Sequence, residues 1–223
     1  ESEAEEVTAE EEEAEAEAKR ERFDREALYL RDVIASGALG EIVKTKGYGV
    51  HQHWGPSGWF TDPDLAGGGA LSDMGVHALD TVRFLLGDPD PVRVYANIST
   101  RHGDYAVDDE GVLVVEWAGG TTSLIESGWW HAHMDGVEAS TQVFGTRGYG
   151  RLFPTAYTTG AGDEARTETP EFPERADHCD QHIYDGQVAE FGARILDGAP
   201  VAPGPEHGHV IMTICDAAYR SSR

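Results

Sequence analysis

A run of three glycines followed by a helical pattern constrains this chain more than any other segment. It reads Gly67-Gly68-Gly69-Ala70-Leu71-Ser72-Asp73-Met74-Gly75-Val76-His77. At about 3.6 residues per turn, Asp73 and His77 project from one helix face, with Asp80 close to their line. The opposite face predicts a buried stripe of Leu71, Met74, Ala78, Val82 and Leu85. A carboxylate and an imidazole on one polar face suit proton transfer; a solvated face behind a flexible turn is the alternative. On either interpretation we expect His77→Ala to leave folding nearly intact.

The order of the remaining patterns predicts the fold class. A helix from about Glu21 precedes a strand at 42–52, the motif helix to about Leu86, a block of strands and two closing helices at 181–196 and 206–221. The strands are expected at 92–101, 111–117, 121–131, 139–145 and 150–153, and 161–177 is expected to be a loop. This order favours an α+β fold: an open, predominantly antiparallel sheet with helices on one face. Residues 1–20, rich in Glu and Ala, form an acidic leader, helical or disordered, and 21–223 form the domain.

The uncovered face of such a sheet needs a partner. Large apolar side chains recur on successive predicted strands, and we interpret them as a partner surface: Tyr95, Val115, Trp117, Trp129 and Val143. We therefore expect a homodimer or tetramer formed through the sheet face.

The charge of the chain excludes several classes of partner. The net charge is −24, from 41 acidic and 17 basic residues. Even without the ten glutamates of positions 1–17, 31 acidic residues face 17 basic ones. Such acidity disfavours nucleic acid and anionic membrane, and with only three lysines it favours a halophilic cytoplasm. No signal peptide or long apolar window is present, and two cysteines are too few for a disulfide framework.

Three motifs follow one another over about nine tenths of the chain. The first is Arg22-Phe23-Asp24 with the segment 30–42, the second is Trp59 with the run from Gly67 to Asp80, and the third comprises the closing segments with Glu190-Phe191 and Ala217-Ala218-Tyr219. In this order they resemble the second half of the glucose–fructose oxidoreductase/inositol dehydrogenase (Gfo/Idh/MocA) family: the first its helix–strand junction, the second its most specific motif and the third its terminal helices.

The resemblance implies an NAD- or NADP-dependent oxidoreductase that acts on a sugar or polyol. His77 would exchange the proton of the substrate hydroxyl, Asp73 would orient and charge-balance that imidazole, and Gly67, Gly68 and Gly69 would lie against the cofactor. The sequence lacks the family's Gly-rich Rossmann turn and its Glu-Lys-Pro segment. We therefore expect a substrate-binding and oligomerisation half that binds no dinucleotide by itself and is inactive alone. On this expectation, the Rossmann domain would be lost, truncated or a separate chain. The alternative is a non-catalytic sugar-binding or scaffolding module.

Histidine pairs raise two further hypotheses. His51 and His53 end the first strand just before Trp59, where the resemblance places the substrate, and Tyr184 is a weaker candidate for the same role. Trp59 and Trp54 are candidates to stack on a sugar face. The pairs recur at His131/His133, His178/His182 and His207/His209, and the best group for zinc is Asp177-His178-Cys179 with His182. No third and fourth ligand stands at a fixed spacing, so we expect no metal site.

Overall fold

The computed structural model describes residues 20–134, 136–173 and 181–223. The acidic leader and the group Asp177–Cys179 lie outside these residues. The elements are, in chain order, η1 (Arg20–Phe23), α2 (Arg25–Ala35), β1 (Ile42–Gln52), η2 (Gly58–Thr61), α3 (Pro63–Ala66), η3 (Leu71–Gly75), α4 (Val76–Leu85), β2 (Pro91–Ser99), β3 (Glu110–Trp117), β4 (Thr122–His131), β5 (Thr141–Gly145), β6 (Gly148–Leu152), β7 (Ala156–Thr159), η4 (Gly162–Glu164), β8 (Arg166–Glu168), α5 (Gln181–Asp197) and α6 (Pro205–Ser221).

One open sheet organises the fold. Its eight described strands lie in the order β2-β3-β4-β1-β5-β6-β7-β8. β1 pairs in parallel with β4, and all the other neighbouring strands pair antiparallel. β1 therefore lies in the middle of the sheet, and the ends of β1 and β4 meet at one edge, where Gln52 is paired with His131.

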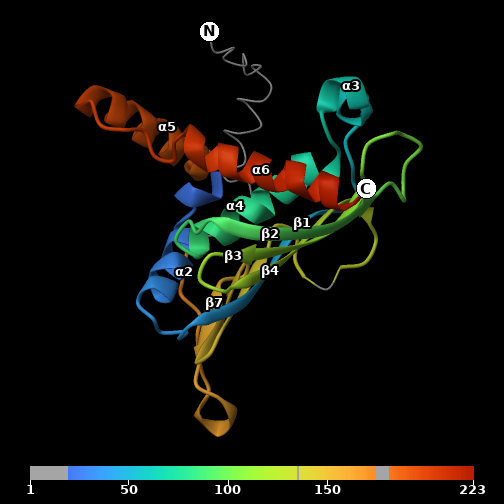
Figure 1. The fold of residues 1–223 in the computed structure, drawn as a ribbon. Coiled ribbons are helices and arrows are strands. Elements are labelled where there is room, and N and C mark those ends of the chain that lie inside the picture. The colour runs from blue at the N-terminus through green and yellow to red at the C-terminus, as the bar shows by residue number, and fades with distance from the viewer. Residues whose placement is uncertain (1–19, 135, 174–180) are drawn as a thin grey trace.

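Helices α2, α4 and α6 pack on one face of this sheet (Figure 1). α4 and α6 enclose one apolar cluster with β2, β3 and β4, in which Leu79, Val115 and Ile214 are at most 1% exposed. α2 and α4 enclose a second cluster with β5 and β6, in which Leu30 and Val143 are fully buried. The predicted α+β fold, with an open and mostly antiparallel sheet, is thus confirmed.

The predicted strand ends hold to within two residues for most of the sheet. The exceptions lie after β6, where β7 was not expected and β8 with η4 occupies the segment predicted to be a loop. Because β7 and β8 are short and polar, they carry little of the alternation that marks a strand.

The predicted partner surface is wrong in four of its five residues. Val115, Trp117, Trp129 and Val143 are at most 2% exposed, because they point toward the helices and form the core. Only Tyr95 is exposed, at 62%. Large side chains at alternate positions mark a buried face, but the sequence does not say which of the two faces is buried.

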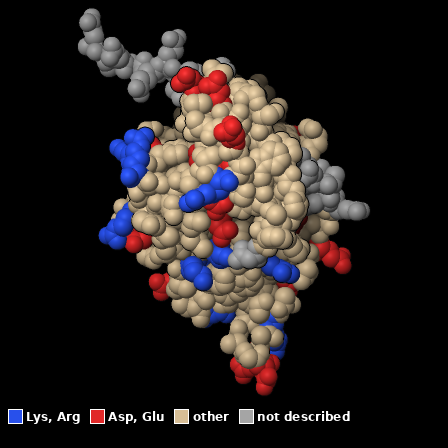
Figure 2. Space-filling model, turned by 90° about the vertical axis from the view of Figure 1, so that its right-hand side faces the viewer, with Lys and Arg blue, Asp and Glu red and all other residues tan. Residues whose placement is uncertain are grey.

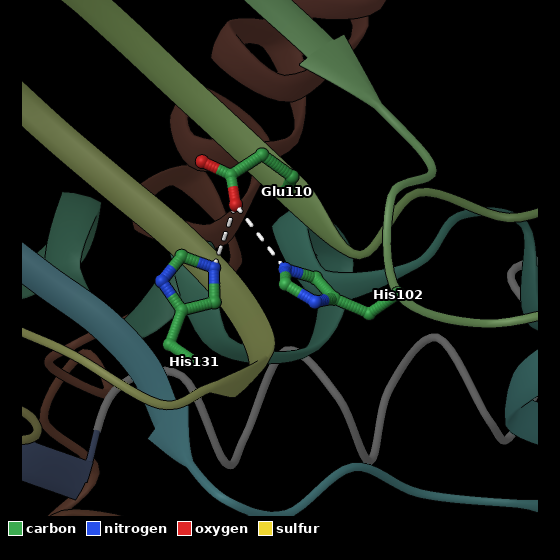
Figure 3. A group of neighbouring side chains, drawn as sticks. All are labelled: His102, Glu110 and His131. Atoms are coloured by element: carbon green, nitrogen blue, oxygen red, sulfur yellow. Dashed lines mark ion pairs between the residues drawn. The ribbon is translucent and has the colours of Figure 1, made fainter.

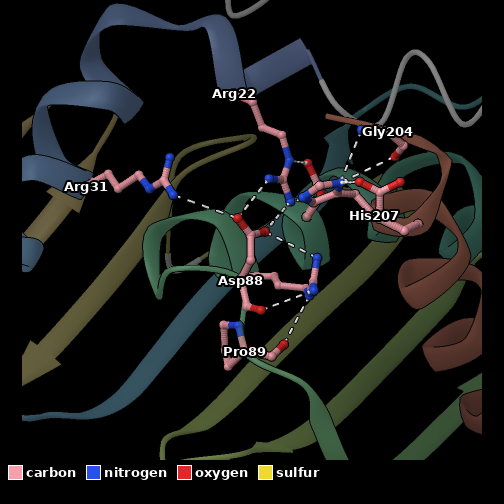
Figure 4. A network of polar contacts seen from close by, with 9 residues as sticks. Arg22, Arg31, Asp88, Pro89, Gly204 and His207 are labelled. Carbon is pink, nitrogen blue, oxygen red and sulfur yellow. Dashed lines mark hydrogen bonds and ion pairs between the residues drawn. The ribbon is translucent and has the colours of Figure 1, made fainter. Parts of the chain in front are cut away.

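An ion-pair network attaches the motif helix to the first turn of the described chain (Figure 4). Arg22 donates from Nε and Nη2 to both carboxylate oxygens of Asp80, at 2.7 and 2.6 Å. The same guanidinium reaches Asp88 at 2.7 Å, and Asp88 also accepts from Arg83 at 3.2 Å. Because Asp80 is fully buried, its negative charge needs a positive partner inside the fold, and Arg22 supplies it.

The surface carries charges of both signs. Figure 2 shows Lys and Arg side chains interspersed with Asp and Glu over one side of the molecule. Among the described helices, none is both long enough and apolar enough to cross a membrane.

Candidate active site

The motif helix begins with one wide turn. Residues Leu71–Gly75 form a π-helical turn, in which the N–H of Val76 donates to the carbonyl of Leu71, and α4 continues from there. Asp73 lies in this turn, and its Oδ2 accepts a hydrogen bond from the indole Nε1 of Trp129 on β4, at 2.8 Å. Trp129 is fully buried, so this bond fixes the carboxylate against the sheet. The sequence pattern of a regular helix did not predict the wide turn.

His77 does not lie on an exposed polar face. Its side chain is in the first turn of α4 and is only 7% exposed, which contradicts both the solvated-face interpretation and the basis for a harmless His77→Ala. The apolar stripe of the motif helix is confirmed, because Leu71, Met74, Ala78, Val82 and Leu85 are all buried. All residues of α4 are buried, so His77 and Asp80 are interior groups, whereas Asp73 in the wide turn is partly buried.

Asp80, the third polar residue of the motif helix, is a structural anchor. Its two oxygens are taken by Arg22 as described above, and it is fully buried. Burial alone would lower the pKa of Arg22, but the hydrogen bonds and charges of Asp80 and Asp88 outweigh it and raise that pKa. Asp80 therefore has a structural role, as the partner of Arg22 in a buried ion pair. Asp73 and His77 remain the candidates for proton transfer.

Asp108 fills the N-terminus of the motif helix. Its Oδ1 accepts from the N–H of Gly69 and its Oδ2 from the N–H of Leu71, both at 2.8 Å. Its backbone carbonyl accepts from the N–H of Ala70, also at 2.8 Å. A Cβ on Gly69 would lie 1.9 Å from that carbonyl oxygen, so this position must be glycine. A Cβ on Gly68 would meet Ser72 and Tyr219, whereas Gly67, at φ +65°, faces open space.

Tyr219 of α6 completes this cap. Its hydroxyl donates to Oδ1 of Asp108 at 2.7 Å. Burial and then the charge of Asp108 raise the pKa of Tyr219, so its hydroxyl stays protonated and remains a donor. Asp108 was missed from the sequence. The signal available in the sequence was the pair Asp108-Asp109 just before a predicted strand. Acidic residues that become buried at such a position must accept hydrogen bonds from other parts of the fold.

Two of the four predicted substrate residues, His51 and His53, lie at the end of β1. His51 is half-buried, contacts Glu138 through Nδ1 and lies edge-on to Trp54 at 4.4 Å between ring centroids. His53 is exposed at the same strand end. Trp59 of η2 is half exposed and stacks on Phe60 at 3.9 Å. The structure thus brings His51 and His53 to one edge of the sheet.

Tyr184 lies elsewhere. It is on α5, which packs against η1, and Figure 1 shows α5 extending away from the side that carries α3. An open surface hollow of about 900 Å³ is lined by the turn after α2 and the β5–β6 hairpin, and it contains none of the predicted site residues. A separate polar group, His102, Glu110 and His131, gathers where β3 begins and β4 ends (Figure 3).

Comparison with known proteins assigns the family. Residues 27–151 match the model of the GFO/IDH/MocA C-terminal domain. The chain is 28% identical to D-xylose 1-dehydrogenase [NADP(+)] of Haloarcula marismortui, over 86% of this chain and 53% of that protein. It is 31% identical to the rhizopine catabolism protein MocA of Rhizobium meliloti, over 88% of this chain and 56% of that protein.

Solved structures agree in fold. An aldose-aldose oxidoreductase of Caulobacter crescentus, complexed with glycerol, matches 92% of this chain and 60% of its own with a TM-score of 0.73 at 23% identity. GenD2 from gentamicin A biosynthesis, in complex with NAD, matches 89% of this chain and 58% of its own with a TM-score of 0.69 at 25% identity. The chain spans little more than half the length of these relatives. Its sequence and fold together show that it belongs to the GFO/IDH/MocA family, whose C-terminal domain it contains.

Proposed function

We propose that this chain is the substrate-binding and oligomerisation half of an NAD- or NADP-dependent sugar or polyol oxidoreductase. The observation that carries the proposal is the anchored carboxylate of Asp73, held by Trp129 at 2.8 Å and four residues before the buried imidazole of His77. A carbinol loses a proton when it loses hydride, so the reaction needs a base whose pKa is near neutrality. Histidine is the side chain that meets this requirement without perturbation.

In this proposal His77 takes the proton from the substrate hydroxyl during oxidation and returns it during reduction. Asp73 orients the imidazole and balances its charge when it is protonated. Because Trp129 fixes Asp73 from the sheet side, the carboxylate keeps its position through the proton transfer. The burial of His77 supports this role, since a proton acceptor excluded from water does not lose its proton to solvent.

The N-terminus of the motif helix does not fit the phosphates of a dinucleotide. Such phosphates bind free N–H groups at a helix N-terminus. Here the N–H groups of Gly69, Ala70 and Leu71 already donate to Asp108, and no room remains at Gly68 or Gly69. Only Gly67 offers an open surface for contact. We therefore place the phosphate site on a separate Rossmann domain. The proposed proton transfer uses only residues of this chain.

Substrate contacts belong, in this proposal, to the sheet edge at the end of β1. His51 and His53 supply hydrogen bonds to sugar hydroxyls, and the half-exposed indole of Trp59 supplies an apolar face. Tyr184 lies on α5 and would reach the substrate only in the complete assembly. The acidic surface supports a protein that works in the cytoplasm of a salt-rich cell, because salt screens the repulsion between its carboxylates.

Two surfaces support the proposed partners. The sheet face opposite the helices exposes Tyr95 at 62% and Val112 at 38%, and we assign it to a second copy of this chain. A row on α5, Val188, Phe191 and Ile195, is 52 to 71% exposed at helical spacing, and we assign it to the Rossmann domain. Light scattering tests the first assignment: Val112→Glu should reduce the oligomer to a monomer, whereas Val188→Glu should not.

Ligand-observed NMR with a panel of aldoses and polyols tests the function. The chain should give saturable signals that His51→Ala and His53→Ala weaken and that His209→Ala, an exposed position on α6, leaves unchanged. A fluorescence titration with NADH and NADPH should show no micromolar binding. Tight dinucleotide binding by this chain would contradict the placement of the phosphate site, and an absence of any sugar binding would favour the scaffolding alternative.

A further inference from the structure

Three side chains with metal-ligand chemistry converge on the sheet face opposite the helices (Figure 3). Glu110 opens β3, His131 closes β4, and His102 comes from the loop between β2 and β3. Nε2 of His131 lies 2.8 Å from Oε2 of Glu110, and Nε2 of His102 lies 3.7 Å from the same oxygen. All three ligand atoms lie within 4.8 Å of one another.

We propose that His102, Glu110 and His131 form a binding site for a divalent metal ion of the zinc type. Zinc binds imidazole nitrogen and carboxylate oxygen at about 2.0–2.2 Å, so tetrahedral ligand atoms lie roughly 3.3 Å apart. The separations of 2.8 and 3.7 Å between Glu110 and the two histidines lie on either side of that value. Two histidines with one carboxylate leave a fourth position for water or another small ligand.

The state of His131 supports a cation at this point. Its Nε2 atom is buried and makes no well-directed hydrogen bond within the described residues, although Oε2 of Glu110 lies 2.8 Å away. A buried nitrogen whose polar contact is poorly directed is only partly compensated for its lost hydration. A metal ion between the two groups would satisfy that nitrogen and neutralise the carboxylate together.

The surrounding backbone holds the ligands in place. Asp109 is fully buried and accepts hydrogen bonds from the N–H groups of Arg101, His102 and Gly103, at 2.6 to 2.9 Å. This bonding fixes the loop that carries His102. His131 lies against the backbone of Gly128. A Cβ at position 128 would be only 2.2 Å from Nε2 of His131, so any residue other than glycine would displace the imidazole. Fixed ligands lose less conformational entropy when an ion binds.

The direct test is zinc titration of the full chain after dialysis against a chelator, in millimolar Mg²⁺ to saturate weak acidic sites. A chromophoric zinc chelator reports the affinity by competition. We expect one tight zinc ion per chain, with affinity lowered at least tenfold in His102→Ala, Glu110→Gln and His131→Ala. Gly128→Ala should lower it as well, because the added methyl group displaces the His131 ring. His209→Ala is the matched control and should bind as the unmodified chain does.

Two results would overturn the proposal: no zinc binding above the Mg²⁺ background, or equal affinity in all the variants. Circular dichroism shows whether each variant folds. If a variant does not fold, the absorption spectrum of Co²⁺ added to the unmodified chain tests the site instead. Strong visible absorption of four- or five-coordinate Co²⁺, displaced by one equivalent of Zn²⁺, supports the site, whereas the weak spectrum of hydrated Co²⁺ contradicts it.

Discussion

The indole of Trp129 donates from Nε1 to Oδ2 of Asp73 across 2.8 Å, joining the core of β4 to the π-helical turn of the motif. Trp129 also packs edge-on against Tyr105 at 6.1 Å and forms a small cluster with Ala70 and Met74. The position of the carboxylate is thus set by the same side chain that fills this part of the core.

Replacing that donor gives the first prediction. Trp129→Phe keeps most of the apolar ring but removes the hydrogen bond, and we expect it to lower the free energy of unfolding by about 1–3 kcal/mol. Urea unfolding measures this, and a double-mutant cycle with Asp73→Ala, which removes the acceptor, isolates the bond. The two effects should be less than additive by about 0.5 kcal/mol or more. Strict additivity would mean that the bond contributes nothing.

The burial of His77 gives a second prediction. His77→Ala removes an interior side chain from the first turn of α4, which leaves a cavity that the packed helix cannot close. We expect a loss of about 1–3 kcal/mol in the free energy of unfolding. His209→Ala, on the exposed side of α6, should change it by less than about 0.5 kcal/mol. Thermal unfolding followed by circular dichroism measures both variants. An unchanged melting temperature in His77→Ala would show that the imidazole is accessible to solvent.

The glycine run gives a third prediction with an internal control. Gly69→Ala drives a methyl group into the Asp108 carbonyl, so the capping loop must leave the helix N-terminus. We expect a cost of about 3 kcal/mol. Gly67→Ala adds its methyl group to open space and should cost about 1 kcal/mol, from its positive φ alone. Differential scanning calorimetry compares the two, and equal costs would refute the Asp108 cap as the reason for the glycine.

Acid stability tests the ion-pair network at Asp88. Burial would raise the pKa of Asp88, but the hydrogen bonds and charges of Arg22, the charge of Arg83 and the charge of His207 hold it below the usual 3.8. As the pH falls below about 3.8, the unfolded chain takes up a proton before the folded one does, and stability is lost. Asp88→Asn should therefore cost about 2 kcal/mol at neutral pH and less at pH 3.

Urea unfolding from pH 3 to pH 7 checks this difference. Asp163→Asn, on the exposed η4, is the control and should follow the unmodified chain at every pH. A constant gap between Asp88→Asn and the unmodified chain across that range would show that Asp88 does not retain its charge below the usual pKa.

Much of the fold could be predicted from the sequence because its signals are local. Alternating strands and the stripe of Leu71, Met74 and Val82 depend only on neighbouring residues, and β1 was predicted with its observed ends. The face of the sheet that is buried depends on where the helices pack, so Trp117 and Trp129 were assigned to the wrong side. The same limit explains His77, whose burial comes from contacts outside its own helix.

The polar groups of the site also divide into those that a local sequence motif predicts and those that only the fold brings together. Asp73 and His77 were found as a motif, but the partner of Asp73 is 56 residues away in the sequence. Asp108 and Tyr219, 111 residues apart, meet only in the fold. His102, Glu110 and His131 likewise carry no common spacing. The register of β3 against β4, with Glu110 opposite Gly128, brings Glu110 to His131, and the loop bonded to Asp109 carries His102 to them.

Turnover by a chimera tests the central claim most directly. The full chain would be joined to the dinucleotide-binding domain of a family relative, and sugar-dependent reduction of NAD⁺ or NADP⁺ would be followed by absorbance. We predict that His77→Asn lowers kcat by about a hundredfold to ten-thousandfold while sugar and dinucleotide still bind, and that His209→Asn leaves it unchanged. A chimera that binds both ligands and turns over equally fast with asparagine at position 77 would contradict the assignment of His77 as the proton acceptor.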